Sequence, residues 1–488
     1  MFTCTTLADN AHQIGCVCHK PEFHAMTRRI NADLSRRGFV AGMGASLATL
    51  ATLGLPARAR AQSARPSASG PTVLTNLRLF DGTSSSLRDG QSLLIEGNQI
   101  KSVATGTPAP PDRAQVIDCG GRTVMPGPID AHWHAMFAAL PVQTLLAGDV
   151  GYIHLAAGAE AERTLMRGFT TVRDLGGPVF AFKQAIDEGL FAGPRIFPSG
   201  TMITASGGHG DLRPLSDLPR FKGGALSTAE QMAGVSIVDS PDEVRLRVRE
   251  QLMQGASQIK IVGSGGVSSP RSPRELLTLS EAELRVAVEV ATDWHTFVTV
   301  HAYTPETIQR AISAGVKCVE HGHLMDDATA ELMANKDIWL SIQPFLTDED
   351  SVPLSGPSRV AQLQVFAGTD NAYKLAIKHG LKTAFGSDML FSAAMAARQG
   401  IMLTHLTRWH SNADILKMAT STNAELLALS GPRNPYPGKL GVLVEGALAD
   451  LLIVDGNPLE NIDLIANPEK SFVLIMKDGK IYKDTIGT

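Results

Sequence analysis

Residues 240–264 read SPDEVRLRVREQLMQGASQIKIVGS and contain a helix followed by a strand. Ser240, with Pro, Asp and Glu after it, forms a capping box with proline at the first helical position. Gly255 marks the end of this helix. The apolar run at 258–264 then has the length of a buried strand. This stretch predicts one α/β unit of a parallel sheet.

The middle of the chain repeats this unit. Helix signals recur at Ser280 and at Thr304-Pro305, and Gly315 closes the helix that begins at Pro305. Eight units in series predict a (β/α)8 TIM-type barrel over residues 127–435, and an open doubly wound sheet is the alternative. The eight strand candidates are IDAHWH (129–134), FTTVRDL (169–175), RIFPSG (195–200), QIKIVGS (258–264), FVTVHAY (297–303), CVEHGH (318–323), WLSIQP (339–344) and KTAFGSD (382–388).

Both ends of the chain that follows residue 61 are rich in short strand patterns. TVLTNLRLF begins at Thr72, and SFVLIMKDGKIYKD ends at Asp484, with Gly and Asp turn signals between the runs. We therefore expect residues 72–126 and 436–488 to form one small β-sandwich domain. Two long irregular segments, 205–238 and 344–368, are expected to be functional loops.

The first 61 residues differ from the rest. Ser35-Arg36-Arg37-Gly38-Phe39 precedes an apolar stretch ending at Leu55, and Ala59-Arg60-Ala61 offers a small-residue cleavage site. This pattern is typical of a twin-arginine export signal. The apolar stretch is shorter than the roughly 20 residues of a membrane span. We expect an exported, periplasmic or secreted protein without a stable membrane span. The alternative is that these residues are an uncleaved anchor or a disordered tail.

Composition narrows the function. The chain has 488 residues, a net charge of −4 and no basic run in its body, so nothing indicates nucleic-acid binding. Of five cysteines, three lie in the first 61 residues, which leaves Cys119 and Cys318 and no disulfide framework.

Polar residues gather where the predicted strands end, which is where barrels carry their chemistry. His132 and His134 are two residues apart and share one face of the first strand, as a chelating pair would. His301, His321 and Asp388 end the fifth, sixth and eighth strands. Five candidate ligands at one end of a barrel predict a metal site.

Lys260 lies between two isoleucines of the fourth strand and faces the same region. Lysine is almost never fully buried unless something pairs it. A neutral amine can react with carbon dioxide, and the carbamate is an anion that can bridge two cations. A carboxylated Lys260 is the interpretation we favour; an ion pair with Asp174 or Glu320 is the alternative.

Together the motifs VMPGPIDAHWH, QIKIVGSGG, VTVHAY, VEHG and FGSD resemble the amidohydrolase superfamily over roughly residues 72–485. The resemblance is greatest to the branch of Xaa-Pro dipeptidases, imidazolonepropionase-like proteins and ochratoxinase-type carboxypeptidases. It implies two divalent metal ions, with zinc expected. His132 and His134 would bind the more buried ion, His301 and His321 the more exposed one. Carboxylated Lys260 would bridge the two, and Asp388 would bind the buried ion and act as the base.

The same resemblance suggests two further residues. A histidine in the loop ASGGHGD (205–211), His209, would polarise the scissile carbonyl; a capping role in a turn is the alternative. Tyr303 would meet the substrate carboxylate, or else only wedge the barrel mouth. His323 is expected to be structural. Large barrels of this family often assemble, so we expect a homo-oligomer.

The predicted activity is hydrolysis of the amide bond in dipeptides or N-acyl amino acids with a free C-terminal carboxylate. Ochratoxin A belongs to this substrate class. The alternatives are a cyclic amide or lactone hydrolase and a catalytically dead binding protein. A deaminase is disfavoured, because His301 is followed by Ala-Tyr-Thr-Pro-Glu rather than by His-x-x-Glu spacing.

Overall fold

The computed structural model describes residues 70–218, 224–269 and 271–486. The predicted export signal at 1–61 lies outside these residues, so that prediction is not tested.

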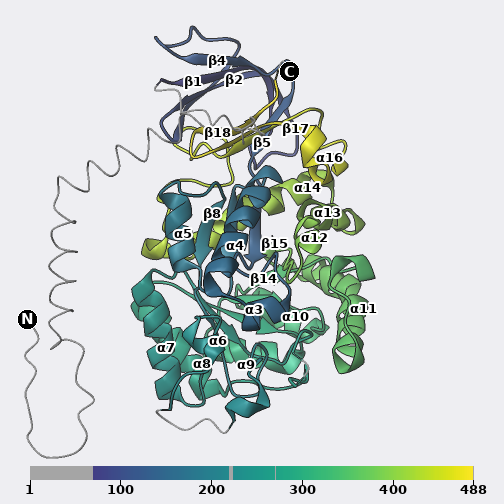
Figure 1. Ribbon diagram of the computed structural model, residues 1–488. Coiled ribbons are helices and arrows are strands. Elements are labelled where there is room, and N and C mark those ends of the chain that lie inside the picture. Colours follow the sequence, from purple (N-terminus) through teal and green to yellow (C-terminus); the bar gives the residue numbers. More distant parts are fainter. Residues whose placement is uncertain (1–69, 219–223, 270, 487–488) are drawn as a thin grey trace, which may run out of the picture. The chain divides into compact units, whose positions relative to one another are not determined.

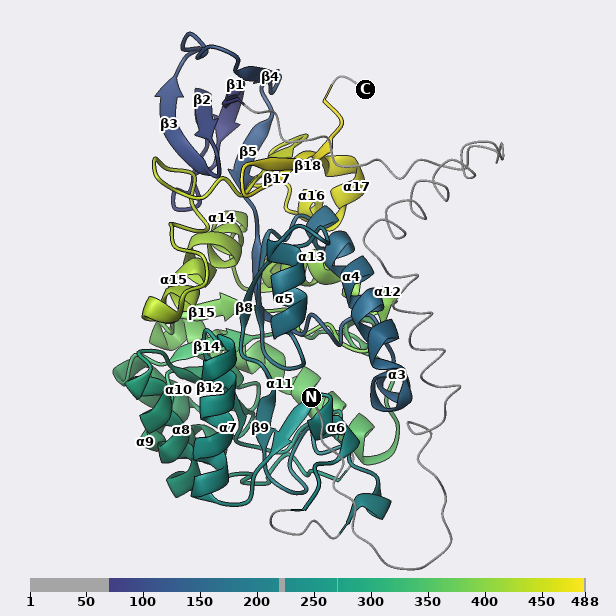
Figure 2. The ribbon, with the colours of Figure 1, turned by 60° about the vertical axis from the view of Figure 1, so that its left-hand side comes forward.

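Strands from both ends of the chain pair in one eight-stranded mixed sheet, in the order β18-β17-β16-β5-β1-β2-β3, with β4 paired to β1. Figures 1 and 2 show the purple and blue strands of the N-terminal part beside the yellow strands of the C-terminal part. The packing of this sheet into a two-layer sandwich stays a prediction. The strands are β1 (Thr72–Leu79), β2 (Arg88–Glu96), β3 (Gln99–Thr105), β4 (Gln115–Asp118), β5 (Thr123–Pro126), β16 (Leu451–Val454), β17 (Phe472–Lys477) and β18 (Lys480–Asp484).

The junction between the two ends is the antiparallel pair of β5 and β16, in which Val124 lies opposite Ile453. Both side chains are fully buried in a cluster that also contains Leu74, Leu93 and Leu474. Burial of these apolar side chains, each worth about 1.5–3 kcal/mol, holds the ends of the chain together.

The middle of the chain forms two parallel sheets. One has the order β6-β7-β8, and the other has the order β10-β9-β11-β12-β13-β14-β15, while β15 also contacts β6. The eight strands that the sequence predicts are present but shorter. Closure of the sheets into a barrel stays a prediction. The strands are β6 (Ile129–Trp133), β7 (Thr171–Asp174), β8 (Arg195–Pro198), β9 (Met202–Thr204), β10 (Val235–Ile237), β11 (Ile259–Val262), β12 (Val298–Ala302), β13 (Cys318–His321), β14 (Trp339–Ile342) and β15 (Thr383–Phe385).

The helices follow the capping signals of the sequence. The Ser240 hydroxyl accepts from the Glu243 amide at the start of α7, and Gly255 ends this helix with a φ of 108°. Figure 2 shows α7 to α10 on one side of the parallel strands. The helices are α3 (Val142–Ala147), α4 (Val150–Met166), α5 (Phe180–Asp187), α6 (Thr228–Gln231), α7 (Pro241–Gln254), α8 (Glu281–Asp293), α9 (Pro305–Ala314), α10 (Asp327–Asn335), α11 (Gly356–His379), α12 (Ala393–Ala396), α13 (Gln399–Thr404), α14 (Asn412–Lys417), α15 (Asn423–Ala428), α16 (Asp463–Ala466) and α17 (Pro468–Ser471).

The two segments expected to be irregular carry more structure than their sequences indicate. β10 and α6 lie within 205–238, and α11 begins at Gly356, so 356–368 is helix rather than loop. Pro357 occupies the first turn of α11, where its missing N–H costs nothing. The expectation of a loop through residue 368 was wrong. A proline in the first turn is only a weak signal of a helix start, and the sequence after it mixes polar and apolar residues.

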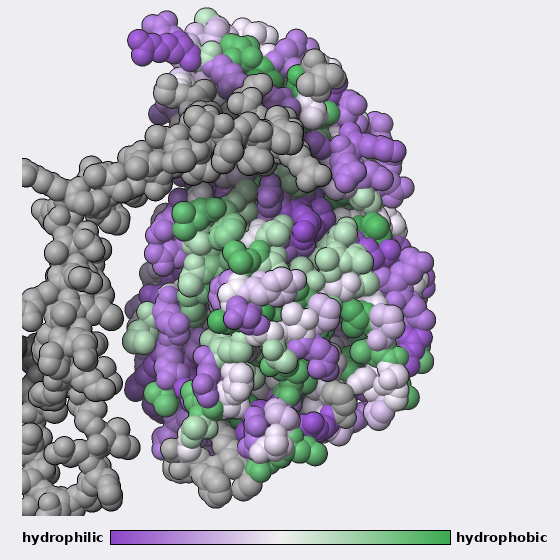
Figure 3. Space-filling view, viewed as in Figure 1, coloured by the Kyte–Doolittle hydropathy of each residue, from purple (hydrophilic) through white to green (hydrophobic). Residues whose placement is uncertain are grey.

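The surface of α4 exposes apolar side chains, with Tyr152 56% and Leu155 65% accessible. Figure 3 shows hydrophobic residues near the middle of this face, in the region where α4 lies in Figure 1.

Within the described part of the chain, none of the helices combines the length and apolar composition needed to cross a bilayer. The predicted homo-oligomer stays a prediction.

Candidate metal centre

All eight predicted site residues line one cleft at the carboxyl ends of the parallel strands. The cleft encloses about 1050 Å³, counting the space at its open mouth. The residues are His132, His134, His209, Lys260, His301, Tyr303, His321 and Asp388.

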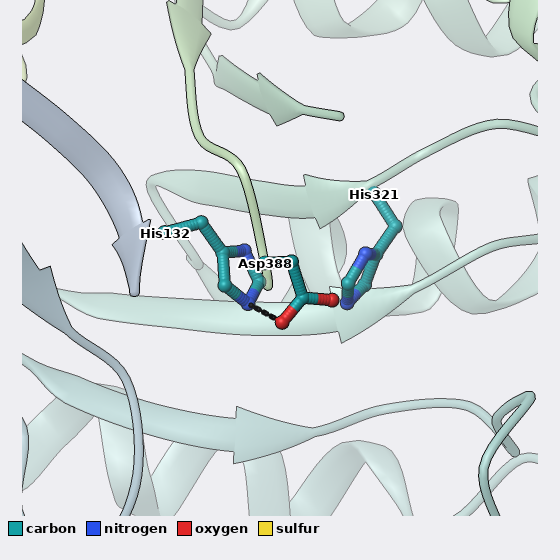
Figure 4. A group of neighbouring side chains, drawn as sticks. All are labelled: His132, His321 and Asp388. Carbon is teal, nitrogen blue, oxygen red and sulfur yellow. Dashed lines mark ion pairs between the residues drawn. The ribbon is translucent and has the colours of Figure 1, made fainter. Parts of the chain in front are cut away.

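Three of these residues form the tightest group. Ligand atoms of His132, His321 and Asp388 lie within 4.8 Å of one another. Figure 4 shows the Asp388 carboxylate between the two imidazoles, with the ion pair to His132 dashed. Asp388 Oδ1 lies 3.4 Å from His132 Nε2 and 3.5 Å from His134 Nε2. This oxygen is buried and has no hydrogen-bond partner among the described residues.

Each of the four histidines has one ring nitrogen next to an oxygen acceptor. His134 Nδ1 lies 3.4 Å from the Gly176 carbonyl, and His301 Nε2 lies 3.1 Å from the Gly265 carbonyl. His321 Nδ1 donates to Gln343 Oε1 at 2.7 Å. A hydrogen bond to such an acceptor fixes the ring proton on the nitrogen that faces it, which leaves the other nitrogen free to bind a cation.

The imidazoles are in the state that a metal requires. Burial, together with the nearby Lys260 ammonium, lowers the pKa of His132 to about 4. Burial likewise holds the pKa values of His134, His301 and His321 well below the usual range. Neutral imidazole is the ligand form, so this donor set fits a divalent cation.

Lys260 lies in β11 and is only 2% exposed. No hydrogen bond or ion pair joins it to any other residue that the structure describes. Burial lowers the pKa of its amine, although the carboxylates of Glu320 and Asp388 act in the opposite direction. The two proposed ion-pair partners are engaged elsewhere, because Glu320 pairs with Arg173 at 2.6 Å and Asp174 accepts from the Ala135 amide. Neither of these carboxylates forms an ion pair with Lys260 among the described residues.

Asp388 has the opposite shift, since burial raises the pKa of its carboxyl group. Its backbone is in the left-handed region with φ of 50°, and His321 has φ of 78°. Non-glycine residues rarely adopt such conformations, and those that do are concentrated at functional sites. A glycine is also required two residues before Asp388, because a Cβ on Gly386 would lie 2.3 Å from His132 Cβ.

His209 and Tyr303 flank the histidine cluster on two sides. The His209 ring stacks on His301 with centroids 4.3 Å apart, and its Nδ1 is buried without a partner. Tyr303 stacks on His321 at 4.9 Å. His323 is fully buried against Phe345, and its Nε2 lies 2.9 Å from the Gln343 carbonyl. Its structural role stays a prediction.

Three contributing residues were not predicted. Gln343 and Arg173 each contact the cluster or its neighbours, as described above. Asp130 accepts from the His132 amide, the Ser387 amide and hydroxyl, and Gln399. It thereby links β6, which carries His132, to the residue before Asp388. The only signal in the sequence was that Asp130 and Gln343 are polar residues within or next to apolar strands.

The remaining walls of the cleft are largely apolar. Two groups of side chains contribute: one from the segments after β6 and β15, and one from the segment between β14 and the middle of α11. The first group contains Phe137, Met389, Leu390, Phe391 and Met395, and the second contains Phe345, Val352, Leu354, Val365 and Phe366.

Known proteins resemble this chain over most of its length. The sequence profile of the amidohydrolase family matches residues 123–483. Ochratoxinase from Aspergillus niger is 31% identical over 394 residues, which are 74% of this chain and 75% of the relative. A solved amidohydrolase superposes with a TM-score of 0.78 at 35% identity, covering 86% of this chain and all of the other. A solved prolidase complexed with N-methylphosphonate-L-proline superposes with a TM-score of 0.77 at 33% identity. The match covers 85% of this chain and all of the prolidase chain.

These similarities define the class as a hydrolase that acts on amide bonds. The chain belongs to the amidohydrolase family.

Proposed function

We propose that this protein is a binuclear metal hydrolase that releases a C-terminal amino acid from N-acyl amino acids or dipeptides. The single observation that carries the proposal is the convergence of four neutral imidazoles, one orphaned carboxylate oxygen and one unpaired buried lysine on one cleft. The names of the relatives add support, since one is an ochratoxinase and another is a prolidase complexed with N-methylphosphonate-L-proline.

In this proposal the parallel strands close into a (β/α)8 barrel and the terminal sheet forms a sandwich beside it. His132 and His134 would hold the more buried cation, and His301 and His321 the more exposed one. Carboxylated Lys260 would bridge them, with Asp388 on the buried cation. Zinc is the expected element for this mixture of imidazole and carboxylate donors. Two such cations supply an acidified water and polarise a carbonyl group.

The residues of the chain divide the remaining work. Asp388 takes the proton from the attacking water and passes it to the leaving nitrogen, since its carboxylate faces the cluster. His209 carries an N–H into the cleft beside His301 and donates to the carbonyl oxygen of the substrate. Tyr303 lies beside His321, and its hydroxyl group donates a hydrogen bond to the substrate carboxylate. No serine or cysteine nucleophile is required.

The apolar walls favour substrates with large hydrophobic groups on both sides of the amide. An aryl amide of phenylalanine such as ochratoxin A fits this description. We further propose that residues 1–61 direct export of the folded enzyme and that the mature protein forms a homo-oligomer.

The test is a hydrolysis screen with proline, phenylalanine and arginine as leaving groups on a common apolar acyl group, with ochratoxin A included. The screen is run on metal-loaded protein, and metal content is measured alongside. We expect about two equivalents of metal and the fastest release for phenylalanine. Hydrolysis restricted to cyclic amides or lactones would replace the proposal with that alternative. Neither metal nor hydrolysis would support a binding protein.

A further inference from the structure

Glu320 is a fully buried carboxylate on β13, one residue before His321. Its Oε1 is held by Arg173 Nη2 at 2.6 Å and by the Thr299 hydroxyl. Its Oε2 has no hydrogen-bond partner among the described residues, yet it lies 2.8 Å from His132 Nδ1. Oε1 is therefore held by two donors, whereas Oε2 has no hydrogen-bond partner and faces His132, a candidate metal ligand.

The His132 ring consequently lies between two orphaned carboxylate oxygens. Glu320 Oε2 faces Nδ1 at 2.8 Å, and Asp388 Oδ1 faces Nε2 at 3.4 Å. A neutral imidazole has one proton to donate, so it can satisfy only one of them. A cation at Nε2 would satisfy Asp388, and the proton would then belong on Nδ1, toward Glu320.

Gln343 competes for the same nitrogen. Its Nε2 lies 3.2 Å from His132 Nδ1, so it can donate there only when Nδ1 carries no proton. That tautomer would place the proton on Nε2 and block cation binding. The choice between the two tautomers therefore depends on whether an acceptor or a donor prevails at Nδ1.

We infer that Glu320 is a positioning residue of the metal centre, which accepts the Nδ1 proton of His132 and leaves the Nε2 lone pair for the cation. Arg173 supplies the compensating charge, and its Nε also donates to the Ala131 carbonyl next to His132. The inference rests on the proposed function, because it assumes that this cleft binds metal.

The first test is Glu320→Gln, which keeps the shape of the side chain. Arg173 needs an acceptor, so the amide oxygen turns toward it and the NH₂ group faces His132 Nδ1. This inverts the preferred tautomer. We expect the metal affinity, measured by competition with a chromophoric chelator, to fall by roughly 10–100-fold for one of the two ions. Wild-type affinity in this variant would overturn the inference.

Two further variants separate positioning from general loss of a buried charge. Glu320→Asp keeps the partner of Arg173 but withdraws the carboxylate from His132, so it should also bind metal more weakly. It carries the test if Glu320→Gln does not fold. Asp450→Asn breaks another buried ion pair, that of Arg195, distant in sequence from every ligand. It should lower the melting temperature and leave metal affinity unchanged.

The outcomes also distinguish this inference from the proposed function. A wild-type protein that binds no metal would remove the proposed function itself. A wild-type protein with two ions, and Glu320 variants that bind them equally well, would remove only the role of Glu320. Equal loss of metal affinity in the Glu320 variants and in Asp450→Asn would also overturn it.

Discussion

The proposed bridged pair of cations depends on Lys260. This residue is buried without an ionic partner, and burial favours its neutral amine, which is the form that reacts with carbon dioxide. We expect Lys260→Ala to lower kcat by at least about 100-fold and to reduce bound metal to less than two equivalents, because the bridge is lost. Metal analysis and steady-state kinetics check this. Full activity in Lys260→Ala would contradict the bridging role.

Gly266 provides a test of His209 that leaves His209 itself intact. A Cβ at position 266 would lie 2.1 Å from His209 Nδ1, so the ring must move away. We expect Gly266→Ala to lower kcat by roughly 10–1,000-fold, the range for a donor to a developing oxyanion. Metal content should not change. Kinetics of His209→Ala and of the double variant complete the test, and a double variant much worse than either single variant would argue against this link.

At this scale the sequence predicted eight residues that the structure brings into the cleft. Six followed from the positions of polar residues on the predicted strands, because side chains at strand ends converge, and His209 and Tyr303 followed from the family resemblance. The partners of those residues could not be found in the same way. Arg173 and Glu320 are 147 positions apart and meet only after β7 and β13 are placed in their sheets. The competition between Glu320 and Gln343 for His132 depends on distances of tenths of an ångström.

Helix α11 supplies part of the apolar wall through Phe366, whose ring lies 6.1 Å from that of Phe345. We expect Phe366→Ala to raise KM for an N-acyl-phenylalanine by roughly tenfold, since the loss of apolar contact costs about 1–2 kcal/mol. The KM for the corresponding alanine substrate should change less. Leu363→Ala is the matched control, because Leu363 lies on the same helix and is 47% exposed. An equal effect on both substrates would remove Phe366 from substrate selection.

Element prediction succeeded where caps and periodicity agreed and failed where tertiary pairing decided. α7, α8 and α9 begin at the predicted serine and threonine residues. β9 and β10 have three residues each, too few for a period-two pattern, and exist because they pair with each other and β9 pairs with β11. Such short strands carry no signal of their own.

Lys477 links the terminal sheet to the parallel sheets, because its Nζ donates to the Gly193 carbonyl at 2.8 Å. Burial lowers the pKa of Lys477 to about 8, below the value near 10.4 of an unfolded lysine. Between these values the unfolded chain holds a proton that the folded chain lacks, so this group adds stability as pH rises from about 8 toward 10. Below pH 8 the folded state bears the cost of burying the charge.

Lys477→Met should therefore be relatively more stable near pH 7 than near pH 10. The difference in unfolding free energy between variant and wild type should shift against the variant by up to about 1.4 kcal/mol per pH unit across this window. Denaturant titrations at pH 7, 8.5 and 10 measure it. Lys480→Met, at an exposed position of the adjacent strand, should show no such trend. If the difference in unfolding free energy between Lys477→Met and wild type did not change with pH, the lowered pKa of Lys477 would be contradicted.

The pairing of β5 with β16 has a consequence for synthesis of the chain. Val124 leaves the ribosome more than three hundred residues before Ile453, which it must meet. During that interval the nascent polypeptide carries an unfinished apolar edge, the kind of surface that recruits chaperones. A premature stop codon anywhere before β16 would leave the β5 edge permanently unpaired. Even a late truncation should therefore yield a product that aggregates.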